Sequence, residues 1–253
     1  MRLFKGLAAA FSTYSAIPMP RIEWDGDTPG LALCCFPAVG IACGGALWGW
    51  YALCRALQTG GVLFAAAGVC LPLLLTGGIH MDGYMDTVDA ISSHQSRERK
   101  LEILKDPHCG AFAVIYCGVA LLLGFGLLHA LYGAALVPVL CPACVLSRAL
   151  SAICALTLPN ARGAGMLFSY TEKVRRGRAL AVLYIVAALS CTGMVLIAPL
   201  PGAGGAALSL AAVFVYRALA LRLFGGVTGD TAGFFLQLCE SAALLGVWIG
   251  GLL

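Results

Sequence analysis

Three aspartates lie close together between residues 77 and 90, a segment with the sequence GGIHMDGYMDTVDA. Asp82, Asp86 and Asp89 are spaced by four and then three residues, so on a helix their carboxylates share one face. Like charges on one face repel each other unless a cation neutralises them. Mg²⁺ prefers oxygen ligands, commonly carboxylates together with substrate phosphates. The spacing predicts an Mg²⁺ site on these three residues, with a solvated acidic helix start as the simpler alternative.

Candidates for proton transfer and phosphate binding lie in the segment that includes these aspartates and continues to residue 106. His80, Asp89 and Asp106 are each able to accept a proton from a hydroxyl group, and the sequence does not choose among them. Lys105, in the basic stretch RERKLEILKD, is a candidate phosphate contact. The stretch is also typical of an amphipathic surface helix with internal ion pairs. Asp106 followed by Pro107 favours a helix start there, opening the next apolar segment.

A second glycine-rich segment, GGVTGDTAG, spans residues 225–233. Its Asp230 follows a Gly-Gly pair at the same distance as Asp82 follows Gly77-Gly78. Asp230 stands at a helix start between Thr228 and Thr231, where it is expected to supply a second carboxylate or to form part of a phosphate-facing turn. Capping of that helix alone is the alternative.

The elements that must position these residues are membrane-spanning helices. Of 253 residues, 60% are hydrophobic and 11% are charged, and the mean hydropathy is +0.92. Soluble domains carry about 25% charged residues. Segments of about 20 apolar residues cross a bilayer. The sequence predicts an all-α, polytopic bundle of about seven spans in a single domain, 1–253, with spans near 31–53, 61–79, 110–131, 136–158, 179–198, 204–224 and 232–253.

Three charged residues, Arg148, Arg217 and Glu240, fall inside the predicted spans. Charges within a membrane are costly, so they are usually paired or functional. A structural ion pair and a substrate-holding pair in an interior cavity are both consistent with the pattern.

Basic residues predict the orientation, because cytoplasmic loops carry an excess of lysine and arginine. Seven spans place four basic regions on one side: Arg2, Lys5 and Arg21; Arg97, Arg99, Lys100 and Lys105; Arg162, Lys173, Arg175, Arg176 and Arg178; and Arg222. The opposite loops hold only Arg55. The N-terminus, the segment 1–30 and a catalytic loop at 80–109 are therefore expected to face the cytoplasm. The acidic residues of the loops fall on the same side, as a cytoplasmic active site requires.

Taken together, these motifs resemble the cobalamin synthase family, the adenosylcobinamide-GDP ribazoletransferases. The resemblance runs in order along nearly the whole chain. It rests on the 77–90 block, RKLEILKD at 99–106, Ser147-Arg148, LPNAR at 158–162, the 225–233 segment and Glu240. The opening FSTYSAIPMP at 11–20 also matches. The family's usual Asp-Ser-Arg is replaced here by Asp106-Pro107-His108.

The resemblance implies a reaction. The family joins adenosylcobinamide-GDP to α-ribazole or its 5′-phosphate, releases GMP, needs Mg²⁺ and lives in the inner membrane. Lys105, Arg148 and Arg162 are then candidates to hold phosphate oxygens. The expected partners are these small molecules and membrane lipid, with no nucleic acid. A homo-oligomer or a complex with other corrinoid-pathway enzymes is a further expectation.

Two other functions fit parts of the pattern. Another Mg²⁺-dependent membrane phospho-alcohol transferase would also use an Asp-rich helix on the inner face. A small-molecule transporter would line a path with charges, but here the acids gather on one side of the membrane and no clear inverted repeat is present.

Overall fold

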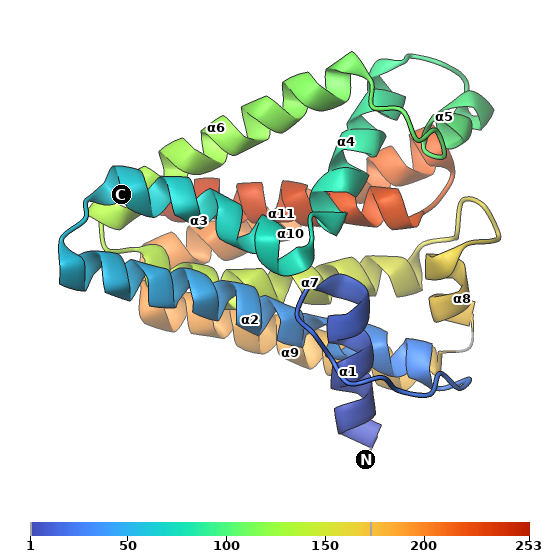
Figure 1. Cartoon of the computed structure of the whole chain (residues 1–253), viewed down its shortest axis with the longest axis horizontal. Helices are drawn as coiled ribbons and strands as arrows, with labels where there is room; N and C mark the ends of the chain where they lie inside the picture. The colour runs from blue at the N-terminus through green and yellow to red at the C-terminus, as the bar shows by residue number, and fades with distance from the viewer. Residues whose placement is uncertain (1, 173) are drawn as a thin grey trace.

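Long apolar helices that run side by side form the body of the protein (Figure 1). The structure is a computed structural model that describes residues 2–172 and 174–253, so Lys173 lies outside the described residues. Within these residues, six helices are long and apolar enough to cross a membrane. They are α2 (Thr28–Leu57), α6 (Ala111–Gly133), η1 with α7 (Val137–Val139 and Leu140–Thr157), α9 (Arg176–Ile197), α10 with η2 (Pro199–Leu219 and Ala220–Phe224) and α11 (Gly229–Gly250).

A bent pair of helices supplies the seventh predicted span. α3 (Gly61–Thr76) and α4 (Ile79–Ser92) meet at an angle of 96°. Gly77 and Gly78 make the bend with φ values of +63° and +76°, which are easily accessible only to glycine. α3 is the apolar part of the pair. α4 runs at a steep angle to α3 and carries the aspartates. The polytopic helical fold is confirmed, with six to seven spans.

Two predicted boundaries are wrong. The predicted loop at 199–203 is helical, since α9 ends at Ile197 and α10 begins at Pro199. Proline is tolerated in the first turn of a helix, where its missing N–H needs no partner. Asp106-Pro107 does not start a helix either, because α6 begins at Ala111 with Gly110 as its N-cap. Asp106 instead accepts a hydrogen bond from the backbone N–H of His108 at 3.0 Å.

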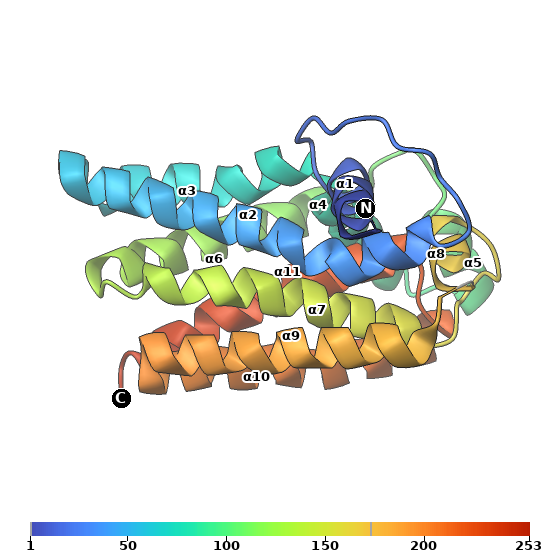
Figure 2. The same cartoon turned by 90° about the horizontal axis from the view of Figure 1, so that it is seen from below.

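Short helices gather at one end of the bundle, and the C-terminus lies at the other (Figures 1 and 2). They are α1 (Arg2–Tyr14), α4, α5 (Arg97–Ile103) and α8 (Met166–Glu172). α1 runs across the direction of the long helices, as an interfacial helix would. The segments predicted to face the cytoplasm thus lie at a common end.

Candidate active site

Close packing of α4 on α11 creates the site. A Cβ atom added to Gly83 would lie 2.7 Å from the carbonyl oxygen of Asp230, and one added to Gly233 would lie 3.0 Å from that of His80. Any side chain at position 83 would push the two helices apart. Glycine therefore lets the acidic face of α4 lie beside the first turn of α11, and it brings the two glycine-rich segments of the sequence together.

The first turn of α11 is held by threonines, which leaves Asp230 free of capping. The Thr228 hydroxyl accepts a hydrogen bond from the backbone N–H of Thr231 at 3.2 Å. The Thr231 hydroxyl accepts one from the N–H of Thr228 at 2.9 Å, which completes a capping box. Thr228, a predicted substrate contact, is buried and acts as the cap. The Asp230 carboxylate accepts a hydrogen bond from the Thr228 hydroxyl at 3.4 Å.

Backbone pairing joins the 158–162 segment to the start of α11. The N–H of Val227 donates to the carbonyl of Pro159 at 2.8 Å, and the N–H of Ala161 donates to the carbonyl of Val227 at 3.0 Å. The pair Asn160–Val227 is thus an isolated parallel bridge between segments far apart in the sequence.

Arg162 reaches the acidic residues from this paired segment. The Asn160 side-chain oxygen accepts from the backbone N–H groups of Arg162 and Gly163 at 3.0 and 2.8 Å, which fixes the turn. The Arg162 guanidinium then lies 3.3 Å from the Asp230 carboxylate. Arg162 and Asp230 are predicted site residues, whereas Asn160 appears only as part of the LPNAR motif, and asparagine is typical of such turns.

The carboxylates of α4 and α11 influence one another. Asp82 is exposed, whereas Asp86 and Asp89 are partly buried. Burial raises the pKa of Asp86 to about 6, with further increases from the negative charges of Asp82, Asp230 and Asp89, while Arg162 acts in the opposite direction. The group formed by Asp82, Asp86, Asp89 and Asp230, called the acidic group below, holds more negative charge than Arg162 offsets.

The acidic group fits Mg²⁺ by its chemistry, since it offers hard oxygen ligands and an excess of negative charge. Within the described residues, no three His, Cys, Asp or Glu side chains converge closely enough to hold a metal by themselves. Mg²⁺ commonly takes one or two carboxylates and completes its shell with water and substrate phosphates. The arrangement thus suits an ion that arrives with a phosphate-bearing substrate, and the metal stays a prediction.

Asp89, Lys105 and Asp106 of the predicted catalytic loop have separate local surroundings. Asp89 packs against Gly110, where a Cβ atom would overlap its carboxylate. Lys105 and Asp106 are exposed in the turn after α5. The Asp106 carboxylate also lies 2.7 Å from the ring Nδ1 of His108, and hydrogen bonds from His108 lower the pKa of Asp106. Local contacts thus engage Asp106, and the roles of Lys105 and Asp106 remain predictions.

His80 is buried in the first turn of α4, beyond the α3 span. Its ring packs at a tilt against Phe36, with ring centroids 5.6 Å apart, and its Nε2 has no hydrogen-bond partner among the described residues. Burial, with a smaller effect of the positive charge of Arg148, lowers the pKa of His80 to about 3. An imidazole this weakly basic suits a hydrogen bond or a stacking contact better than proton abstraction.

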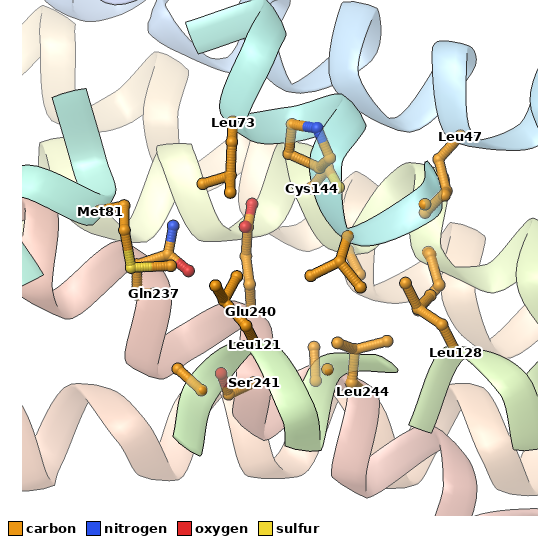
Figure 3. A pocket seen from close by; sticks show the side chains of 18 residues that line it. Leu47, Leu73, Met81, Leu121, Leu128, Cys144, Gln237, Glu240, Ser241 and Leu244 are labelled. Atoms are coloured by element: carbon orange, nitrogen blue, oxygen red, sulfur yellow. The ribbon is translucent and has the colours of Figure 1, made fainter. Parts of the chain in front are cut away.

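Arg148 and Glu240 form an ion pair inside the bundle. Arg148 is 1% exposed and also donates to the carbonyl of Cys144 at 2.9 Å, and the Ser147 hydroxyl donates to Glu240 at 3.2 Å. Glu240 lies with Gln237 at a cavity between α3, α6, α7 and α11 (Figure 3). The two charges pair with each other, which is the structural alternative, and a substrate contact for either stays a prediction.

A cavity of ≈ 270 Å³ opens beside the acidic group. Asp82, Arg162 and Asp230 line one part of it, and residues of α1, α2, α7 and α8 line the rest. Fold and site together define a helical, multi-spanning membrane protein with carboxylates and an arginine around a cavity at one end of the bundle.

Comparison with known proteins names the family. The chain belongs to the cobalamin-5-phosphate synthase family, whose model matches residues 6–248. The adenosylcobinamide-GDP ribazoletransferase of Lachnoclostridium phytofermentans is 40% identical over 98% of this chain and 95% of its own. Proteins of that name from Clostridium botulinum Alaska E43 and Desulfitobacterium hafniense are 33% and 39% identical, each over 84% or more of both chains. No solved structure matches. The resemblance inferred from the motifs is confirmed.

Proposed function

We propose that this chain transfers ribazole to adenosylcobinamide-GDP, as the names of its relatives state for them. The products are adenosylcobalamin, or its 5′-phosphate, and GMP. The observation that carries the proposal is the acidic group with Arg162 at the edge of a cavity, because a diphosphate substrate needs both a cation site and a direct cationic contact.

The proposed reaction is a displacement at phosphorus. A ribose hydroxyl of α-ribazole attacks the cobinamide-bound phosphorus of the diphosphate. A new phosphorus–oxygen bond forms, the bond to the bridging oxygen breaks, and GMP leaves with that oxygen. Such reactions depend on positioning and charge neutralisation more than on covalent help. Arg162 would hold a phosphate oxygen through its planar fork of donors.

The hydroxyl proton needs an acceptor. Of the three predicted bases, we assign the role to Asp89. His80 is too weakly basic, and Asp106 is exposed and engaged by His108. Asp82 and Asp86 would hold Mg²⁺, which leaves Asp89, the third predicted ligand, free for the proton. When bound, Mg²⁺ would neutralise charge on the diphosphate oxygens.

The proposed location is the inner membrane, with the site facing the cytoplasm. Support comes from the positive-inside distribution of arginine and lysine. It also comes from the position of α1, α4, α5 and α8 at the same end of the bundle (Figure 1).

The purified protein in detergent tests the function. Adenosylcobinamide-GDP, α-ribazole and Mg²⁺ are mixed with it, and GMP and the joined corrinoid are followed by chromatography. Equal amounts of both products are expected, with α-ribazole or with its 5′-phosphate. Absence of both products with a well-folded protein and either nucleoside form would contradict the proposal, and GMP without joined corrinoid would indicate a hydrolase.

A further inference from the structure

The cavity beside the acidic group has an aromatic wall built from three separate helices. Tyr14 of α1, Phe36 of α2 and His80 of α4 all line it. The ring centroids of Tyr14 and Phe36 are 4.2 Å apart, those of Phe36 and His80 are 5.6 Å apart, and those of Tyr14 and His80 are 6.5 Å apart. The three rings therefore pack into one surface.

A fourth ring, Tyr170 of α8, also lines the cavity and is held from two sides. Its hydroxyl lies 3.1 Å from that of Thr13, and its ring stacks on Trp24 with centroids 5.9 Å apart. α8 is only seven residues long, so these contacts with the N-terminal segment help to hold it in place. Such preorganised rings suit a flat aromatic ligand.

The volume of the cavity restricts which part of the reactants it can hold. Pockets for drug-sized ligands measure roughly 300–1,000 Å³. At ≈ 270 Å³ the cavity suits a single nucleoside. A corrin ring with its amide side chains is several times larger, so it must stay outside, at the open side of the acidic group.

Two heteroaromatic bases take part in the proposed reaction, and the wall favours one of them. Guanine carries several donors and acceptors that need partners when buried. The benzimidazole of ribazole is largely apolar and has a single free ring nitrogen. The wall is apolar apart from the tyrosine hydroxyls and His80, whose buried Nε2 has no hydrogen-bond partner in the described part of the chain. A benzimidazole can stack there and brings only one ring nitrogen that needs a hydrogen-bond partner, fewer polar groups than guanine would bury.

We propose that Tyr14, Phe36, His80 and Tyr170 form the binding site for the base of the incoming ribazole nucleoside. Its ribose then points toward Asp82, Arg162 and Asp230, which line the same cavity, so that the attacking hydroxyl meets the diphosphate there. The inference rests on the proposed function. It assigns the cavity to the acceptor nucleoside and the space outside the cavity, next to the acidic group, to the corrinoid.

Kinetics of Tyr14→Leu test the site, with Tyr14→Phe keeping the ring. Loss of base stacking is expected to raise the KM for α-ribazole at least about fivefold. The KM for adenosylcobinamide-GDP should change less than about twofold, and Tyr14→Phe should raise the KM for α-ribazole less than Tyr14→Leu does. Phe125→Leu is the control, because Phe125 lies in the distal half of α6 and stacks on His129. An increase confined to the KM for adenosylcobinamide-GDP would overturn the proposal in favour of guanine.

Ala155→Leu is a second variant, which adds a side chain where Tyr14→Leu removes a ring, so the two variants affect folding in different ways. Ala155 of α7 lines the cavity, so a larger side chain there should fill it and raise the same KM. Equilibrium dialysis with α-ribazole alone separates the two proposals. If the wild type binds α-ribazole but shows no turnover, and Tyr14→Leu no longer binds α-ribazole, the proposed binding site is supported and the proposed function is contradicted. If both variants turn over with an unchanged KM for α-ribazole, the proposed binding site is contradicted and the proposed function is not.

Discussion

The α-carbon of Gly83 lies so close to Asp230 that a Cβ atom at position 83 would be 2.7 Å from the Asp230 carbonyl oxygen. This contact connects the two halves of the candidate site, since α4 carries Asp82 and Asp86 and α11 carries Asp230. The distance between the carboxylates therefore depends on the absence of a side chain at position 83.

Gly83→Ala is expected to impair activity by moving α4 away from α11. Overpacking of this kind costs about 1–3 kcal/mol, and a shift of about 1 Å at a reacting centre can reduce the rate roughly a hundredfold. We expect a lower kcat and a lower thermal midpoint in detergent. Gly118→Ala is the control, because a Cβ atom there meets nothing within 4 Å. Equal activity of the two variants would contradict the importance of the contact.

Arg162→Gln is expected to reduce kcat by roughly a hundredfold or more, as loss of a preorganised donor at a developing charge does. It removes the cation that lies 3.3 Å from Asp230 and opposes the repulsion within the acidic group. Arg162→Lys should fall between the wild type and Arg162→Gln, because lysine keeps the charge but not the planar fork. Arg178→Gln, at an exposed position of α9, is the control. Steady-state GMP release measures all four proteins, and full activity of Arg162→Gln would exclude the role.

Arg148→Met and Glu240→Leu are expected to destabilise the protein singly, because each leaves an unpaired charge inside the bundle. Breaking a buried ion pair costs about 3–5 kcal/mol. The double variant should be more stable than either single variant, as measured by thermal unfolding in detergent. If it is as active as the wild type, the pair is structural. If stability returns but activity does not, one of the two residues contacts substrate, as the sequence also allowed.

Much of the fold could be predicted from the sequence, because hydropathy and length determine where a helix can cross a bilayer. The spans predicted at 110–131 and 136–158 correspond closely to α6 and to η1 with α7. The loop predicted at 199–203, between the spans 179–198 and 204–224, is wrong, because α10 already begins at Pro199. Here Pro199 occupies the first turn of α10, where proline is compatible with helical structure.

The acidic group could be predicted only in part. Helical spacing brings Asp82, Asp86 and Asp89 to one face, and this spacing can be read from a short stretch of sequence. The approach of Arg162 depends on backbone pairing between Pro159 and Val227, which no local pattern indicates. The aromatic wall likewise combines rings from helices that are distant in the sequence. Long-range packing of this kind leaves no periodic signal.

In the proposed reaction the acidic group carries out the transfer with Mg²⁺, and Asp86→Asn tests this role most directly. Asn keeps the size of the side chain but removes its negative charge. Single-turnover formation of joined corrinoid is measured for the wild type, Asp82→Asn and Asp86→Asn, with and without EDTA. The exposed Glu23→Gln serves as a control, with near-ultraviolet circular dichroism to check folding. We predict that the wild type loses turnover with EDTA and regains it with added Mg²⁺, and that both folded Asn variants are inactive. Turnover that survives both substitutions, or that persists without divalent metal, would contradict the account.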